Sequence, residues 1–349
     1  MRFAVVPTSG HPTPPPRRFA RGVPVPTPQP AIFAGPGRSQ WYLHLSRAGY
    51  SADEAGNLVG GSSDPATLAV IRAALAQLRA DCDDHGVNLL IAFGPTLLAD
   101  LTDEAPADFQ PYTTIESADG SSRRAVATQE EMLLWLHHSR TDTVWKAQYD
   151  VRTALAPQMA VARETPAFVL GPSLDMTGFE DGIANRSPDE AAEVALVPDG
   201  EPGAGGSHVI AQRWVHDLEG WNRLPVPDQE SIIGREKHPG RGKLADQAPH
   251  SHLRHTELRE DGRHGLSDSE ERDEMFRRSA PYAFHDGTVG LYFVGFSSAQ
   301  APLRERMDLM YGHGAANGIR DGLTNFSQPA SGSFYFAPSR ETLSDICAG

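Results

Sequence analysis

Strand-like apolar runs alternate with helical patterns in both halves of this 349-residue chain. Residues 41–45 and 87–93 are rich in apolar and aromatic side chains, as strands are, and residues 209–215 and 290–296 repeat that character in the second half. Helical spacing follows each of these runs. The order strand, helix, strand, helix in each half predicts an α+β fold made of two ferredoxin-like halves, with an antiparallel sheet in each.

The first helix has clear signals at both ends. Asp64 is an N-cap residue, Pro65 suits the first helical position, and Gly86 is a typical C-terminal stop. Apolar residues recur at helical spacing between them, which predicts a helix up to about residue 83. Thr128 and Glu131 have the spacing of a capping box and predict a second helix over residues 132–138. Further helices are expected near residues 228–235 and 302–311.

Charge and cysteine content exclude several classes of protein. A net charge of −14 disfavours nucleic acid and anionic membrane as partners. No apolar run approaches the length of a membrane span. The two cysteines, Cys82 and Cys347, cannot build a disulfide framework or a zinc motif.

The N-terminal 36 residues hold ten prolines and cannot pack a core. Arg17-Arg18 is followed by further prolines instead of an apolar helix, so the segment does not resemble an export signal, and we expect a cytoplasmic protein. The expected organisation is a tail over residues 1–36, an N-terminal half over 37–160 and a C-terminal half over 161–349.

The stretch from Gly178 to Gly182, with sequence Gly-Phe-Glu-Asp-Gly, is the first candidate for a functional site. Glycines on both sides of Asp181 let the backbone take positive φ or approach a bound group closely, so a short carboxylate can project into a pocket. The same pentapeptide is also compatible with an Asp-Gly turn on the surface. The residues alone leave both interpretations open.

Downstream stretches add further candidates. His250, His252 and His255 lie within six positions, a spacing that fits a metal site or a solvated loop. Arg277 and Arg278 are adjacent, and the sequence alone does not choose between them. Asp321 precedes an aromatic-rich segment that ends at residues 334–338.

Taken together and in this order, these motifs resemble those of the dye-decolorizing peroxidases, haem enzymes of the dimeric α+β barrel group. The resemblance rests on Gly-Phe-x-Asp-Gly with an Asn three residues later, on Ser251-His252-Leu253-Arg254, and on Arg-x-Ser-x-Pro-Tyr from Arg277. It runs from about residue 29 to residue 338 and is strongest to the bacterial type B subgroup. It implies a homo-oligomer with haem b in the C-terminal half.

The resemblance also assigns roles. It implies His252 as the iron ligand, with Asp321 as the acceptor of the other imidazole N–H. It implies Asp181 as the proton carrier for hydrogen peroxide and Arg277 as the cation that stabilises developing charge. Further haem-contacting residues are expected at Gly182, Ile183, Ser279, Leu291 and Phe293.

Two positions depart from the family pattern. Ser279 stands where type B members often carry Asn, and Arg186 replaces a proline after the distal loop. Neither change removes a catalytic group. The expected activity is a haem peroxidase that reduces hydrogen peroxide and oxidises phenols, dyes or other small aromatic donors. The alternative is a haem-binding or haem-handling protein with incidental peroxidase activity.

Overall fold

A computed structural model describes residues 26–35, 37–171, 173–183, 185, 188–238, 242–257 and 275–349. Most of the predicted proline-rich tail and residues 258–274 lie outside these ranges. The described chain combines helices and antiparallel strands, so the prediction of an α+β fold is confirmed. None of the helices in the described ranges has the length and apolar character that a membrane span requires.

Within the described residues, ten strands form one sheet in the order β10-β12-β9-β14-β4-β7-β1-β8, with β11 beside β12 and β13 beside β9. One sheet therefore spans both halves, where the sequence pattern predicts a sheet in each. The predicted boundary between residues 160 and 161 falls inside β8. The strands are β1 (Ser39–Arg47), β4 (Asn88–Phe93), β7 (Met132–His138), β8 (Met159–Phe168), β9 (Ser207–His216), β10 (Phe276–Arg277), β11 (Ala280–Ala283), β12 (Val289–Ser297), β13 (Ser327–Pro329) and β14 (Ser333–Ala337).

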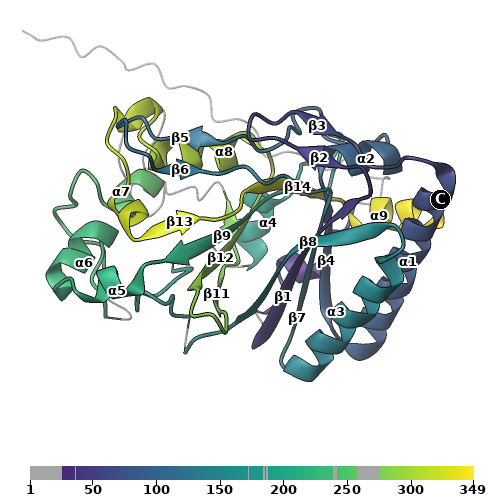
Figure 1. Cartoon of the computed structure of the whole chain (residues 1–349), viewed down its shortest axis with the longest axis horizontal. Coiled ribbons are helices and arrows are strands. Elements are labelled where there is room, and N and C mark those ends of the chain that lie inside the picture. The colour runs from purple at the N-terminus through teal and green to yellow at the C-terminus, as the bar shows by residue number, and fades with distance from the viewer. Residues whose placement is uncertain are drawn as a thin grey trace, which may run out of the picture.

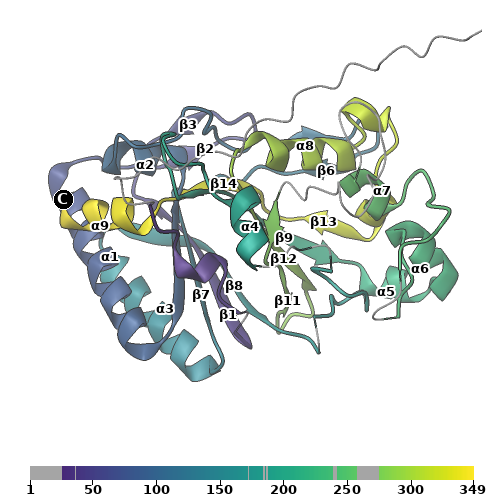
Figure 2. The ribbon, with the colours of Figure 1, turned by 180° about the vertical axis from the view of Figure 1, so that it is seen from behind.

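Helices cover one face of the sheet in two groups (Figures 1 and 2). Over the N-terminal half lie α1 (Pro65–His85), α3 (Thr141–Leu155) and the C-terminal helix α9 (Arg340–Ala348), with α2 (Pro95–Leu101) nearby. The C-terminal half carries α5 (Leu218–Asn222), α6 (Val226–Ile233), α7 (His252–Glu257) and α8 (Ala301–Met310). Short 3-10 turns lie at Pro30–Ile32 (η1), Gly314–Ala316 (η2) and Gly322–Asn325 (η3), and two small hairpins at β2–β3 (Ser51–Ala52, Leu58–Val59) and β5–β6 (Ile115–Glu116, Arg124–Ala125).

The other face of the sheet is concave and holds a second core, closed partly by α4 (Pro188–Ala195). His44 of β1 lies at its centre. Its Nδ1 is 2.7 Å from the Tyr335 hydroxyl on β14, and its Nε2 is 2.7 Å from the Tyr292 hydroxyl on β12. Because β1 and β12 are far apart in the strand order, these bonds tie the two halves together across the concavity.

The predicted helix over residues 132–138 is wrong. These residues form β7, which pairs with both β1 and β4 and is almost wholly buried. The expected capping residues have other partners, because the Glu131 carboxylate binds the buried Arg47 guanidinium and the Thr128 hydroxyl accepts a bond from Gly332. Burial on both faces of the sheet outweighed a local end signal.

Candidate functional site

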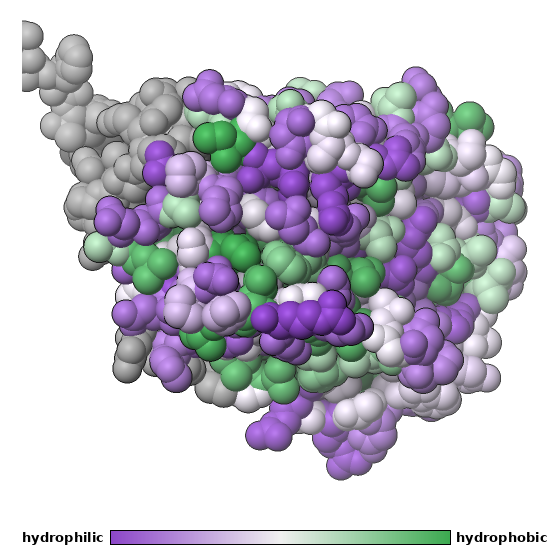
Figure 3. Space-filling model, turned by 60° about the vertical axis from the view of Figure 1, so that its left-hand side comes forward, coloured by the Kyte–Doolittle hydropathy of each residue, from purple (hydrophilic) through white to green (hydrophobic). Residues whose placement is uncertain are grey.

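A cavity lies between the sheet and the two helices α7 and α8 in the C-terminal half. In the N-terminal half the corresponding helices α1 and α3 pack directly on the sheet through residues such as Leu75 and Val144. The empty space of the cavity is about 880 Å³ counting its open mouth. Figure 3 shows hydrophobic side chains gathered among hydrophilic ones on the face that includes this half. We call the cavity between the sheet, α7 and α8 the first cavity. Its walls include Asp181, His252, Arg277, Leu291 and Phe293.

The loop that carries Asp181 is shaped by its glycines. Gly178 has φ +85° and donates to the Asp175 carbonyl, closing a tight turn. Phe179 is buried and packs edge-on against Trp221, which anchors the loop. Gly182 has φ +75°, a conformation that other residues adopt at a cost. Residues 178–182 therefore form a turn, and this turn also places Asp181 at the wall of the first cavity.

Asp181 is held in a defined orientation. Its Oδ1 accepts a 2.8 Å bond from the Gly182 amide, which leaves Oδ2 for a proton or a ligand. Burial raises the pKa of Asp181, while the nearby Arg277 guanidinium acts to lower it and the Asp175 carboxylate acts to raise it. The net shift is upward, so this carboxyl group takes up a proton more readily than an exposed one.

The two adjacent arginines face different parts of the molecule. Arg277 lines the first cavity, and its backbone is clamped by the side chain of Asn185, which donates to the Arg277 carbonyl at 2.6 Å and accepts from its amide at 3.0 Å. Arg278 lies on the concave side of the sheet, over the ring of Trp135. Of the two, only Arg277 lines the first cavity, which makes the choice that the sequence left open.

His252 begins α7, and its Nδ1 lies 2.6 Å from Oδ2 of Asp321. Asp321 is completely buried, and its Oδ1 accepts a second bond from the Leu323 amide at 2.8 Å. Burial acts to lower the pKa of His252, but the Asp321 carboxylate outweighs it, so the pKa is raised. Since Nδ1 is engaged, Nε2 is the nitrogen that remains for a ligand.

The three clustered histidines have different surroundings. His252 lines the first cavity. His250 is exposed to solvent. His255 is buried, and its two ring nitrogens lie 2.9 Å and 2.8 Å from the carbonyls of Ser251 and Ile319. Only His252 of the three combines a place in the cavity with an uncommitted ring nitrogen in the described part of the chain.

A second cavity meets the first at Asp181 and Arg277, which line both. Two of the residues expected near a cofactor, Gly182 and Ser279, line this second cavity. Ile183 lines neither cavity, and 43% of its surface is exposed.

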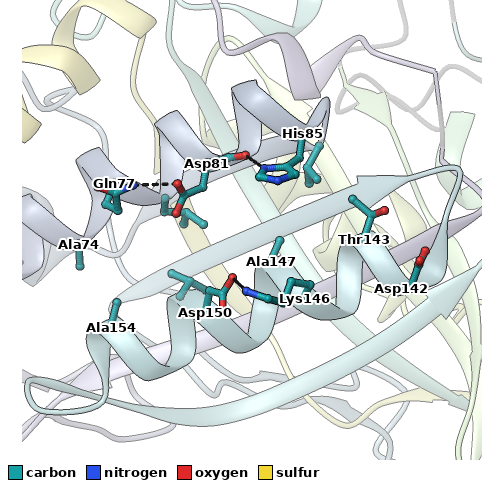
Figure 4. Close-up of a pocket in the computed structure, with 13 residues that line it drawn as sticks. Ala74, Gln77, Asp81, His85, Asp142, Thr143, Lys146, Ala147, Asp150 and Ala154 are labelled. Atoms are coloured by element: carbon teal, nitrogen blue, oxygen red, sulfur yellow. Dashed lines mark hydrogen bonds and ion pairs between the residues drawn. The ribbon is translucent and has the colours of Figure 1, made fainter.

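A separate groove runs between α1 and α3 on the surface of the N-terminal half (Figure 4). Its polar side chains are paired along each helix: Gln77 donates to Asp81, the His85 ring bonds the Asp81 carbonyl, and Lys146 pairs with Asp150. Polar groups that satisfy one another at the surface do not converge on a ligand. We therefore place the candidate site in the cavities of the C-terminal half.

Comparison with known proteins agrees with this placement. Residues 173–342, which carry most of both cavities, match the family model for the C-terminal part of the Dyp-type peroxidases. The dye-decolorizing peroxidases of Rhodococcus erythropolis and Brevibacterium linens are 29% and 28% identical to the chain over 69% of its length. The chain is therefore similar to the dye-decolorizing peroxidases, and its residues 173–342 match the C-terminal part of that family.

The matched region covers 68% and 63% of these two relatives' own lengths. Solved structures of the family share the fold over nearly the whole chain. A dye-decolorizing protein from Vibrio cholerae aligns with a TM-score of 0.76 at 27% identity, covering 90% of this chain and 98% of that one. DyPB from Rhodococcus jostii aligns with a TM-score of 0.77 at 24% identity, covering 91% and 97%.

Sequence analysis missed a second group of polar side chains in the first cavity. Asp175, His216 and Ser327 all line it. Oδ1 of Asp175 lies 3.2 Å from Nε2 of His216, and Nδ1 of His216 lies 2.8 Å from the Ser327 hydroxyl. The only signal was Asp175 six residues before Asp181, because His216 and Ser327 come together through the pairing of β9 with β13.

Proposed function

We propose that this chain is a haem-dependent peroxidase that reduces hydrogen peroxide and oxidises small aromatic donors. The observation that carries the proposal is the first cavity itself, where a carboxylate-bound histidine, the half-buried carboxyl group of Asp181 and a guanidinium share one largely apolar space. Variants of DypB from Rhodococcus jostii, which have the same fold, were solved in complex with heme. A simple haem carrier needs neither Asp181 nor Arg277, so the alternative of haem handling is not favoured.

The donors present fit haem b. Among the described residues, no three His, Cys, Asp or Glu side chains come together as a protein-only metal site requires. A metal at His252 therefore needs its other ligands from a cofactor, as a macrocycle provides for haem iron. Leu291, Phe293 and Met307 supply apolar walls.

Each residue has a distinct task in this proposal. Haem, when bound, would supply the iron that reduces peroxide and oxidises aromatic donors. Nε2 of His252 binds the group, and Asp321 fixes the ring orientation and makes the imidazole more basic. Oδ2 of Asp181 takes a proton from peroxide and returns it to the leaving oxygen. Arg277 stabilises the negative charge that develops there.

The test is haem binding by single variants. His252→Ala should lose stoichiometric haem, or its histidine-ligated Soret spectrum, because it removes the one uncommitted histidine nitrogen that the described ranges place in the first cavity. His250→Ala is the matched control from the same segment and should keep both. Haem retention by His252→Ala together with haem loss in a neighbouring histidine variant would assign the ligand to that neighbour.

The type B subgroup, the cytoplasmic location, the homo-oligomeric state and the domain boundaries belong to this proposal as predictions. Peroxide-dependent oxidation of a phenol by the haem-loaded chain, compared with the same chain without haem, tests the activity. Haem binding without peroxide turnover would favour the haem-handling alternative.

A further inference from the structure

The second cavity has a character of its own. It lies on the concave side of the sheet and opens to solvent, with about 1020 Å³ of empty space counting its mouth. Aromatic rings of Phe33, Phe168 and Phe276 line it, with Trp135 at its buried base. Phe33 and Phe276 stack with their ring centroids 5.6 Å apart. Flat apolar walls of this kind suit an aromatic ring.

A half-buried cation lines the same cavity. The Arg278 guanidinium donates to the carbonyls of Ile32 and Ala34 at 2.7 Å and 2.5 Å, and it lies over the rings of Trp135 and Phe276. Burial lowers the pKa of Arg278 to about 10, so the group is still charged at neutral pH. No Asp or Glu of the described ranges forms an ion pair with it.

Carbonyl oxygens and ring faces satisfy donors, but they do not neutralise a charge. A buried charge without a counter-ion is costly, and proteins normally pair it. Next to Arg278, the Ser279 hydroxyl is buried and has no hydrogen-bond partner in the described structure. A cation and a hydroxyl donor therefore face the same aromatic-walled space, and together they would satisfy an anionic group.

We propose that the second cavity is a binding site for a small aromatic carboxylate. The ring lies among Phe33, Phe168 and Phe276, and the carboxylate accepts hydrogen bonds from Arg278 and Ser279. A charged acceptor on a guanidinium forms a stronger bond than a neutral one, so the site prefers the acid to its uncharged analogues. Trp135 of β7, Phe168 of β8 and Phe276 of β10 build the walls, with Phe33 directly after η1 and with Arg278 and Ser279 directly after β10.

The first test needs no variant. Fluorine NMR titration of the full chain, with and without haem, compares 4-fluorobenzoate with 4-fluorobenzamide, which has the same ring and no charge. Benzoate should bind saturably, and the amide about tenfold more weakly or worse. Equal affinity for the acid and the amide, or no saturable benzoate binding, overturns the proposal.

The second test assigns the binding to Arg278. Arg278→Gln should weaken 4-fluorobenzoate binding by about tenfold or more, and Ser279→Ala should weaken it by a smaller factor. The matched control is Arg72→Gln, because Arg72 also donates to two backbone carbonyls, of Ile346 and Leu101, but lies far from the cavity. It should bind benzoate like the wild type. Unchanged binding in a folded Arg278→Gln chain contradicts the assignment.

If Arg278→Gln does not fold, Arg278→Lys and Ser279→Ala decide, since Lys keeps the charge but loses the planar fork. Arg278→Lys should then bind more weakly than the wild type and still prefer the acid to the amide. Loss of that preference, or wild-type affinity in both variants, contradicts the proposal. A chain that binds benzoate but no haem would refute the proposed peroxidase and support this site. A chain that binds haem but no benzoate would refute this site and leave the proposed peroxidase standing.

Discussion

The two oxygens of the Asp321 carboxylate act on different parts of the chain. Oδ2 holds the His252 ring, and Oδ1 caps the short turn that begins at Gly322. The same buried side chain therefore fixes the ligand histidine and the backbone behind it. An amide of equal size separates the two effects, because it keeps an acceptor for the cap and replaces the other oxygen by a donor.

Asp321→Asn should raise the reduction potential of the haem iron, because the imidazole loses its anionic acceptor and stabilises ferric iron less. Spectroelectrochemical titration of the haem-loaded chain measures the shift. Asp175→Asn is the control, since this buried carboxylate binds His216 and does not contact His252. A potential that moves equally in both variants would mean that the field of any buried carboxylate, and not the bond to His252, sets it.

Asp181 should make the rate of reaction with peroxide fall at low pH, and we call this fall the acid limb of the pH–rate profile. The pKa of this carboxyl is raised by burial, so the rate of reaction with peroxide should fall as pH drops through a value above the ordinary 3.8. Stopped-flow mixing across pH measures it. Asp181→Ala should lose the limb and slow the reaction by about 10²–10⁴-fold.

Two further variants check the sign of that effect. Arg277 lowers the pKa of Asp181, so Arg277→Leu should keep the limb, move it to higher pH and slow the reaction by about 10²–10³-fold. Asp175 raises that pKa, so Asp175→Asn should move the limb to lower pH. A limb that persists in Asp181→Ala would make Asp175, which lines the same cavity, the next candidate for the proton carrier.

At the scale of single elements, α1 shows how local signals position a helix. It begins after Asp64, whose side chain accepts a bond from the Thr67 amide, and it ends at Gly86 with φ +66°. A Cβ at Gly86 would meet no atom within 4 Å, so only backbone conformation opposes a side chain there. Gly86→Ala should therefore lower the free energy of unfolding by about 1–2 kcal/mol.

Gly86→Asn is the matched comparison, because asparagine tolerates the left-handed region better than alanine. Urea titration of both variants should rank the wild type above Asn and Asn above Ala. Alanine and wild-type proteins of equal stability would show that the end of α1 relaxes into another conformation. Local signals failed at β7, because the capping pattern before it did not produce a helix and both faces of the strand are buried.

At the scale of the whole molecule, His44 joins the halves through Tyr292 and Tyr335. Burial lowers the pKa of His44 to about 3, so the folded chain keeps this ring neutral. In the unfolded chain the ring has an ordinary pKa of 6.5 and takes up a proton below it. The contribution of His44 to stability is therefore complete above pH 6.5 and is lost as pH falls toward 3, by up to ~1.4 kcal/mol per pH unit.

His44→Gln keeps a donor and an acceptor but does not titrate. The free energy of unfolding measured between pH 6.5 and 4 should fall less steeply in this variant than in the wild type, by about one proton. His137→Gln provides a comparison, because His137 is also buried with a pKa lowered to about 4 but binds no tyrosine. Identical slopes in wild type and His44→Gln would show that His44 takes up its proton equally in the folded and unfolded states, and would contradict the lowered pKa.

Local patterns predicted much of the secondary structure. The ends of α1, the strands β1, β4, β9 and β12, and the helix α8 follow from residues whose propensity, capping and burial agree. The glycine-flanked Asp181 and the adjacent arginines were also visible as candidates, because their chemistry is carried by neighbours in the chain.

Tertiary structure decided the rest. Strand pairing made residues 132–138 a strand, since a run buried on both faces gains more from the sheet than from a helix. Spacing could not choose among His250, His252 and His255, and burial against α8 and Asp321 separated them. Folding also brings Asp175, His216 and Ser327 together. It places Arg278 beside the aromatic walls of the second cavity. Such sites depend on contacts between distant residues, and no local pattern encodes those contacts.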